Sequence, residues 1–445
     1  MMQREDVHVV AARQPLDQPE QARHHALAAG AVDAAGHDEA DAHAASASHE
    51  RCRRDVPIRA RVSPSNHEPS RRLVLRQAQD ERSGEAMTKR ARKTENRWTV
   101  LVAALLVLAP DPARPLMVAR DTLDIYFIDV EGGQSTLLVT PAGDSLLVDT
   151  GYPGFDGRDP TRILAAARDA GVTRIDYLLI THFHTDHDGG VVDLARQIPI
   201  RTFIDHGGLL PTGDAEKDSR WPGYVALLNA YIPVRAKGKH LEPKPGDRLP
   251  LKGVDIVFVS SAAATIAKPV QGAGQPNPAC EASAPPAQDP YENPRSTGFQ
   301  LRFGTFRFID LGDLSGPPLF ALLCPSSLLG PADLYLVPHH GGPDVSYPAT
   351  FAAVHPLVAI LNNGATKGGS PEVFAGLRRA RGLHDVWQLH RSENQGAENF
   401  ADDRIANLDE ATGHWIKASA NRDGSFTVTN GRTGVTKSYT ARARP

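Results

Sequence analysis

The chain has 445 residues, of which 41% are hydrophobic and 23% are charged, and its formal net charge at pH 7 is −3. This length accommodates two or three average domains, or one large domain with additional segments. A net charge so close to zero gives no reason to expect nucleic-acid or membrane-surface binding through bulk electrostatics. No stable nucleic-acid partner is therefore predicted, and the oligomeric state is left open.

The first 86 residues differ in composition from the rest of the chain. They are rich in Ala, His, Arg, Asp and Glu, hold few aromatic residues and carry seven of the 18 histidines. Without a sustained apolar period, this composition is typical of solvated, disordered chain rather than of a metal-binding tail. A second interpretation is that residues 1–86 are a spurious upstream translation, because a signal-like segment begins at Met87.

Residues 87–119 are predicted to be a signal peptide and linker. Basic residues at 89–97 precede an apolar run over 100–109, which is too short to cross a bilayer as a mature helix but suits a secretory signal. This predicts a periplasmic or secreted protein; a membrane anchor through 98–109 is the alternative, because no clean cleavage motif follows. In an oxidising compartment, Cys280 and Cys324 either form one disulfide or remain separate thiols.

From residue 120 to 395 the chain alternates short β-rich runs with helical patterns, which predicts one main domain. Strands are predicted over 123–130, 136–140, 145–149, 176–180, 200–205, 254–259, 298–303, 305–310, 333–337, 357–361 and 385–389, and helices over 161–170, 191–198, 222–231 and 371–380. The Ala-, Pro- and Gln-rich stretch 262–295 predicts a loop insertion. Residues 396–445 predict a β-rich C-terminal extension with a tight turn at Asn430–Gly431. The order of elements suggests two sets of antiparallel strands stacked face to face, with helices outside.

The stretch 181-THFHTDHDGG-190 holds three histidines and two aspartates directly after an apolar strand. His182 and His184 are two residues apart and point the same way in extended chain, and Asp186 and His187 follow. Two such sets of ligands suit two divalent metal ions. Imidazole with carboxylate favours zinc, with manganese or iron as alternatives.

Two later strands end in the same types of residue. Gly312 and Asp313 follow the run 305–310, and His339 and His340 follow the run 333–337. Alone, the first pair is typical of a turn and the second of a surface. Because each pair ends a β-run, as the first motif does, Asp313 and the two histidines become candidate metal ligands.

Together these motifs resemble the metallo-β-lactamase superfamily and, more narrowly, the lactamase-like domain of ComEC-type competence proteins and their free-standing secreted relatives. The resemblance covers roughly 123–395. It rests on HxHxDH and, in the family's order, on 127-FIDVEGGQSTLLVTPAGDSLLVDTG, 292-ENPRSTGFQLRFGTFRFIDLGD, 335-YLVPHHGG and 357-LVAILNNG. It implies an α+β fold, a four-layer αβ/βα sandwich with a dinuclear metal site at one edge.

The resemblance also implies roles for individual residues. His182 and His184 match ligands of the first metal, Asp186 and His187 ligands of the second, Asp313 the bridging carboxylate, and at least one of His339 and His340 a ligand of the second metal. Asp149 matches an aspartate that orients the ligands without binding metal. Asn293 and Ser296 match a pattern with a structural role.

One ligand of the wider superfamily has no clear counterpart in this chain. Related hydrolases supply a third histidine to the first metal from a loop beyond HxHxDH. His206 is a candidate for that ligand or for a substrate contact, whereas His240, in a Lys-rich loop, is predicted to be exposed. His390 ends a strand and is a further candidate for lining the pocket.

The implied function is that of a metal-dependent hydrolase, in which a hydroxide held by two metals attacks a phosphodiester or another ester. The predicted catalytic residues are Asp186, His340 and His206, with His206 or the spare member of the 339–340 pair giving a proton to the leaving group. The stretch 363–372 predicts anion binding through backbone N–H groups, which favours phosphate. Alternatives are hydrolysis of a lactone, a β-lactam or another acyl substrate, a non-catalytic secreted metal-binding module, and redox use of the scaffold with iron.

Overall fold

A computed structural model describes residues 121–209, 219–284, 286–287 and 291–442. All described residues belong to the compact unit 89–445. The predictions for residues 1–86 and 87–119 therefore lie outside the described residues. Within the described ranges, the helices are all too short or too polar to cross a membrane.

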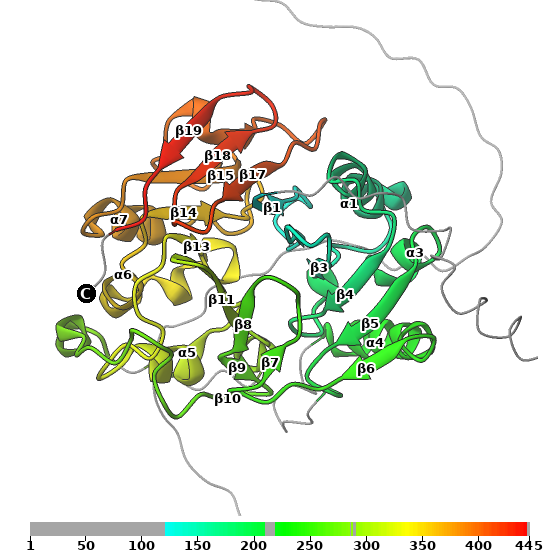
Figure 1. Cartoon of the computed structure of the whole chain (residues 1–445), viewed down its shortest axis with the longest axis horizontal. Helices are drawn as coiled ribbons and strands as arrows, with labels where there is room; N and C mark the ends of the chain where they lie inside the picture. The colour runs from blue at the N-terminus through cyan, green and yellow to red at the C-terminus, as the bar shows by residue number, and fades with distance from the viewer. Residues whose placement is uncertain (1–120, 210–218, 285, 288–290, 443–445) are drawn as a thin grey trace, which may run out of the picture. The chain divides into compact units, whose positions relative to one another are not determined.

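Among the described residues, nine strands form a first sheet in the order β19-β18-β17-β1-β2-β3-β4-β5-β6. Their bounds are Leu123–Phe127 (β1), Thr136–Val139 (β2), Ser145–Val148 (β3), Ile175–Leu179 (β4), Ile200–Ile204 (β5), Lys239–Leu241 (β6), Ile416–Ala420 (β17), Phe426–Asn430 (β18) and Thr436–Tyr439 (β19). Strands β3 to β6 pair parallel and the others antiparallel. Figure 1 shows the C-terminal strands β17–β19 beside β1.

A second sheet has eight described strands in the order β16-β15-β14-β13-β12-β11-β8-β7. They are Arg248–Leu249 (β7), Asp255–Phe258 (β8), Phe299–Phe303 (β11), Phe306–Asp310 (β12), Leu334–Leu336 (β13), Val358–Leu361 (β14), Asp385–His390 (β15) and Ile405–Asn407 (β16). Strands β12 to β16 pair parallel. A small separate sheet pairs β9 (Ser260–Ser261) with β10 (Ala264–Thr265).

Helices cover the outer face of each sheet (Figure 1). The helices are α1 (Arg158–Asp169), α2 (Thr185–Asp188), α3 (Val191–Ala195), α4 (Trp221–Arg235), α5 (Gly316–Leu323), α6 (Pro348–Val354) and α7 (Pro371–Arg379). Short 3-10 turns are η1 (Phe155–Gly157), η3 (Pro278–Ala282), η4 (Asn293–Arg295), η5 (His339–Gly341), η6 (Pro343–Val345) and η7 (Asp402–Arg404). Helices α1, α3 and α4 pack on the first sheet, and α5, α6 and α7 pack on the second.

The side-chain alternation of the strands explains the layers. In β12, Phe306 and Phe308 lie in the apolar core between the two sheets, whereas Ile309 lies in the core under the helices. Burial on both faces gives near-continuous apolar strands instead of alternating ones. The predicted four-layer αβ/βα sandwich is confirmed.

Several details differ from the sequence predictions. The sheets are mixed rather than antiparallel, because the helical connections between β3, β4, β5 and β6 return each strand in the same direction. Helices α5 and α6 were not predicted, since their short apolar runs lack a clear period. The turn after β18 spans 431–434 instead of being a two-residue Asn-Gly turn, with the Asn430 amide donating to the Val435 carbonyl.

The predicted insertion 262–295 is held down where the structure describes it. Asn277 is 5% exposed, and its side-chain amide donates to the backbone carbonyls of Leu323 (3.1 Å) and Ala349 (3.0 Å). Cys280 and Cys324 form a disulfide, so of the two alternatives the structure contains the bonded one. These contacts fix the segment around η3 to the helical layer formed by α5 and α6.

The topology brings the candidate site residues to one edge. Asp149 follows β3 and Thr181 follows β4, which are parallel neighbours. Asp313 follows β12 and His339 follows β13, which are also parallel neighbours. The carboxyl ends of parallel strands meet at the same edge of a sheet, and polar side chains gather there because the backbone turns away from the core.

Candidate metal centre

The HxHxDH motif lies between β4 and α2. The backbone is still extended at His184 (φ −105°, ψ 151°) and then turns into α2, which begins at Thr185. His182 and His187 are fully buried, and Asp186 is 5% exposed. Burying so many polar groups costs free energy unless each finds a partner.

Asp149 fixes the position of the HxHxDH motif through contacts with Thr181 and His187. Its Oδ1 accepts a hydrogen bond from the Thr181 amide (2.7 Å), and its Oδ2 accepts one from the Thr181 hydroxyl (2.7 Å) and contacts His187 Nδ1 (2.7 Å). Asp149 adopts a left-handed backbone conformation (φ 60°), which is uncommon outside glycine and directs the carboxylate at the motif. Bonding at Nδ1 leaves His187 Nε2 to face Asp313 Oδ2 at 3.1 Å.

Asp313 reaches the same point from the second sheet. At Gly312 a Cβ atom would lie 2.9 Å from the Thr181 Cβ, so a glycine is needed for the two strand ends to approach. The Asp313 amide donates to Ser296 Oγ (3.2 Å), which agrees with the structural role predicted for Ser296.

The structure distinguishes between His339 and His340. His340 Nε2 lies 3.1 Å from both Asp186 Oδ2 and Asp313 Oδ2, whereas His339 Nε2 is 3.8 Å from Asp313 Oδ2. Asp186, His187, Asp313 and His340 each direct one ligand atom into a common space, with all four atoms within 4.8 Å of one another. We call these four buried residues the metal cluster.

The charges of the metal cluster favour a cation. Burial opposes the ionisation of Asp186 and Asp313. Lys367 and His187 nevertheless hold the pKa of Asp186 well below the usual range, and the neighbouring histidines do the same for the pKa of Asp313. Burial also opposes a charge on His187, but the carboxylates of Asp313, Asp186 and Asp149 raise its pKa well above normal. The carboxylates therefore attract positive charge to this space, and a divalent cation would meet that demand as a proton does.

Unpaired buried atoms test whether the residues fit a metal. His182 Nε2, His184 Nε2, Asp313 Oδ1 and both ring nitrogens of His340 are buried without a hydrogen-bond partner among the described residues. His340 Nε2 is close to two carboxylates, but neither contact has hydrogen-bond geometry. Unsatisfied buried groups are rare in native proteins and costly, so ligand atoms that converge without bonding fit a divalent metal.

His182 and His184 form a looser second set. His182 Nε2 lies 3.9 Å from Asp313 Oδ2, and its ring is 4.5 Å from that of His184. Burial lowers the pKa of His182 well below its ordinary value and that of His184 to about 4, so both are neutral, as a metal ligand must be. Within the described part of the chain, these two histidines do not complete a three-ligand group at the spacing of the metal cluster.

Residues 129–266 match the family model described as the metallo-beta-lactamase superfamily. The coenzyme F420H2 oxidase of Methanothermobacter marburgensis is 29% identical over 115 residues, which are 26% of this chain and 25% of that protein. The chain thus spans about a quarter of the curated relative that it matches. The segment that matches the family model contains the HxHxDH motif, so this part of the chain is similar to the metallo-beta-lactamase superfamily.

Solved structures show weaker likenesses. A metallo-β-lactamase with a HARLDQ motif from Cronobacter sakazakii is 17% identical and aligns over 43% of this chain and 61% of its own, with a TM-score of 0.26. The metallo-β-lactamase fold protein YhfI from Bacillus subtilis is 12% identical over 60% of this chain and 96% of its own, with a TM-score of 0.37. Likenesses at this level say nothing about the activity of this protein.

The contacts of His206 differ from those predicted. Its Nε2 lies 3.0 Å from Glu292 Oε2, and its ring packs on Phe183 with centroids 4.8 Å apart. His206 is 7% exposed and does not contribute an atom to the metal cluster. The prediction of a third histidine at the metals, or of a catalytic proton donor at this position, is not supported by these contacts; the histidine instead pairs with a buried carboxylate.

His390 lies in a second buried cluster, which we call the ion-pair cluster. His390 Nε2 contacts Asp129 Oδ1 (2.9 Å) and Glu131 Oε2 (3.0 Å), while Arg162 contacts the other oxygens of these carboxylates at 2.6 and 2.7 Å. Its acids are thus matched by an arginine and a histidine, and His390 does not line the metal cluster. His240 also differs from its prediction, since only 26% of its side chain is exposed and Nε2 bonds Asp205 (2.9 Å).

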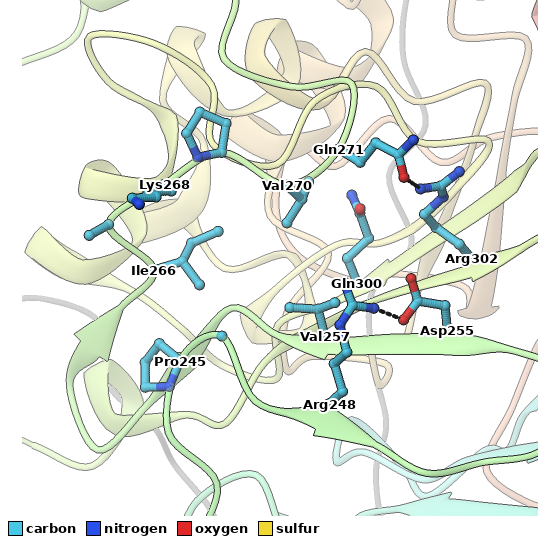
Figure 2. Close-up of a pocket in the computed structure, with 13 residues that line it drawn as sticks. Pro245, Arg248, Asp255, Val257, Ile266, Lys268, Val270, Gln271, Gln300 and Arg302 are labelled. Atoms are coloured by element: carbon cyan, nitrogen blue, oxygen red, sulfur yellow. Dashed lines mark hydrogen bonds and ion pairs between the residues drawn. The ribbon is translucent and has the colours of Figure 1, made fainter.

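A cavity of about 420 Å³ lies elsewhere, on the outer face of the second sheet beside β8 and β11 (Figure 2). It is bordered by a loop around Lys268. Its arginines are already engaged, because Arg248 pairs with Asp255 and Arg302 with Gln271. Among the described residues, none of the groups that could hold a metal lines this cavity, so the metal centre is the candidate functional site.

Sequence reasoning missed several residues around the metal centre. These are Thr181, Glu292, Asp344 and Lys367. Thr181 Oγ1 lies 3.1 Å from His182 Nδ1 and thus helps to orient that ring. The position of Thr181 at the end of β4 was a usable signal. Lys367 lies in the stretch 363–372, where anion binding was predicted through the backbone and not through this side chain.

Proposed function

We propose that this protein is a metal-dependent hydrolase that uses two divalent cations, with zinc favoured, to cleave a phosphodiester or another ester. The observation that carries the proposal is the metal cluster, in which four buried ligand atoms converge while neighbouring ring nitrogens have no bonding partner. Most members of the superfamily are hydrolases, which supports an enzymatic role. Imidazole and carboxylate ligands suit zinc, and manganese and iron accept the same donors.

The residues divide between two cation positions around Asp313. Its Oδ2 lies 3.1 Å from the Nε2 atoms of His187 and His340, and 3.9 Å from His182 Nε2. We assign Asp186, His187 and His340 to one cation and His182 and His184 to the other, with Asp313 shared. When bound, two such cations would lower the pKa of a water molecule toward about 7 and polarise the bond to be broken.

The protein's own groups would orient this site and supply a proton. Asp149 and Thr181 fix the ring directions of His187 and His182. His339 stands outside the metal cluster, with Nδ1 held by Asp344 at 2.8 Å and Nε2 directed toward Asp313. His339 is therefore the member of the 339–340 pair that we place as proton donor to the leaving group, with Asp344 fixing its tautomer.

Metal analysis with a substrate panel tests this proposal. The full chain is stripped with a chelator, reloaded separately with zinc, manganese or iron, and assayed on bis-p-nitrophenyl phosphate, p-nitrophenyl acetate, a lactone and a β-lactam. We expect up to two metal ions per chain and metal-dependent turnover, with the phosphodiester preferred. Preference for the lactone or β-lactam would favour acyl hydrolysis, and failure to bind metal would refute the proposal.

A further inference from the structure

The loop between β14 and α7 lies against the metal cluster, and three of its backbone amides already donate hydrogen bonds within the protein. The Gly364 amide donates to the Lys367 carbonyl (2.9 Å), the Gly369 amide to the His340 carbonyl (2.9 Å), and the Ser370 amide to the Gly341 carbonyl (2.9 Å). The backbone anion site predicted over 363–372 is therefore wrong at these three amides. The loop instead presents a cationic side chain to the metal cluster.

That side chain is Lys367. Its Nζ lies 2.7 Å from Asp186 Oδ2 and 3.3 Å from Tyr152 Oη, and 5.6 Å from the centre of the Tyr152 ring. Lysine in this position contacts an atom that also lies 3.1 Å from both His187 and His340. With 21% of its side chain exposed, Lys367 borders both the metal cluster and solvent, as a residue that meets substrate must.

The backbone holds Lys367 in register with the metal cluster. At Gly368 a Cβ atom would lie 2.2 Å from the His340 carbonyl oxygen, so only glycine allows the loop to pass this ligand residue. On the other side, a Cβ at Gly132 would lie 2.9 Å from the Gly364 nitrogen. The Asn394 amide further anchors the Gly368 carbonyl at 2.7 Å. Lys367 is therefore placed by a tightly packed loop rather than by a chance surface contact.

We infer that Lys367 binds the negative charge of the substrate and makes the site selective for anionic esters, of which a phosphodiester is the simplest. This inference rests on the proposed function. With divalent cations in the centre, their positive charge exceeds the negative charge of Asp186 and Asp313. The ammonium group of Lys367, which lies close by, is then repelled by the cations. An anionic oxygen shared by Lys367 and the centre relieves this repulsion, whereas a neutral ester does not.

The opposing interpretation is that Lys367 only balances the charge of Asp186. Substitution of a residue that only balances charge would change the metal content, and it would slow the hydrolysis of every substrate by the same factor, because such a residue acts on the metal centre alone. A substrate-binding residue discriminates between anionic and neutral substrates. A charged hydrogen bond contributes about 1.5–3 kcal/mol, which corresponds to roughly 10- to 100-fold in kcat/KM.

The test compares Lys367→Met and Lys367→Arg with wild type in the metal-loaded full chain. Values of kcat/KM are measured for bis-p-nitrophenyl phosphate, an anion, and p-nitrophenyl acetate, a neutral ester, with metal content measured in each sample. We expect Lys367→Met to lose at least about 10-fold more activity on the phosphodiester than on the acetate, mainly through KM. Lys367→Arg should recover part of the loss, because it keeps the charge. Lys252→Met, at a lysine whose side chain is 69% exposed, is the matched control and should change neither activity.

Three results would overturn the inference: equal losses on both substrates, no loss on either, or a wild type that hydrolyses only the acetate. If the wild type hydrolyses neither ester, the proposed function fails in this assay, and binding of inorganic phosphate then tests Lys367 separately. Calorimetry of phosphate binding to the metal-loaded protein should show weaker affinity in Lys367→Met. Equal affinity in wild type and Lys367→Met would exclude an anion-binding role.

Discussion

The metal cluster and the ion-pair cluster contain the same kinds of residue but differ in how their charges are satisfied. Each joins two carboxylates to histidine in a buried setting. In the ion-pair cluster, Arg162 bonds both acids and His390 bonds Asp129, so that only Glu131 Oε2 lacks a hydrogen-bond partner among the described residues. In the metal cluster, His187 Nε2 bonds Asp313 Oδ2, but both ring nitrogens of His340 and Asp313 Oδ1 lack a hydrogen-bond partner among the described residues. Residue type alone thus does not identify a metal site; the balance of charge and the unsatisfied ligand atoms do.

Removing the shared carboxylate should give the largest effect and the most direct test of this contrast. We expect Asp313→Ala to lose bound metal and at least about 100-fold in activity, because even residues that only orient metal ligands contribute 10- to 100-fold. Metal content per chain and turnover measure this. Asp129→Asn, which removes a carboxylate from the ion-pair cluster, should leave the metal content of the protein unchanged. Two metals and full turnover in Asp313→Ala would show that the assignment is wrong.

A substitution in the ion-pair cluster should instead lower the free energy of unfolding. Arg162→Met leaves the carboxylates of Asp129 and Glu131 without their arginine in a buried site. Breaking a buried pair in this way costs about 3–5 kcal/mol of unfolding free energy. Urea unfolding measures the loss, with metal content expected to stay at the wild-type level.

A surface pair gives the control for that experiment. Arg196 and Asp193 pair at 2.6 Å, but their side chains are 71% and 41% exposed. Arg196→Met should therefore change the unfolding free energy by less than about 1 kcal/mol. If Arg162→Met is as mild as Arg196→Met, or if it releases metal, the two clusters are not separate in function.

This contrast also marks what the sequence could predict. Strand ends were recognisable from apolar runs, and His182, Asp186, His187 and Asp313 follow such ends, so most of the centre was predictable. Asp149, which was predicted to orient the ligands, contacts His187 Nδ1, and a histidine ligand needs such a partner at its second nitrogen. The layers followed from the same apolar runs, each buried on both faces.

Contacts between distant loops could not be predicted. His206 and His390 also end strands, yet each meets a carboxylate from another segment, Glu292 or Asp129, and is engaged there. Lys367 is 181 residues from Asp186 in the chain, and no local pattern signals their contact. The distinction between His339 and His340 depended on backbone direction, since both have a left-handed φ and only the second turns into the metal cluster.

The smallest expected effect is on the pH dependence of stability, which should depend on His390 of the ion-pair cluster and not on the metal cluster. Burial opposes the charge on His390, but Asp129 and Glu131 outweigh it and raise the pKa of His390 to about 9, from 6.5. Because the folded state binds this proton more tightly, the contribution is complete below pH 6.5 and disappears as the pH rises through about 9. The groups facing His390 are Asp129 and Glu131, with Arg162 on their far oxygens. Burial raises the pKa of Asp129, whereas His390 and Arg162 outweigh burial and lower the pKa of Glu131. Thermal unfolding between pH 6 and 10 should therefore show a fall in Tm of at least about 2–4 °C, the shift that 1 kcal/mol produces. His390→Gln should abolish this slope without changing metal content, whereas an unchanged slope in the variant would assign the pH dependence to another group.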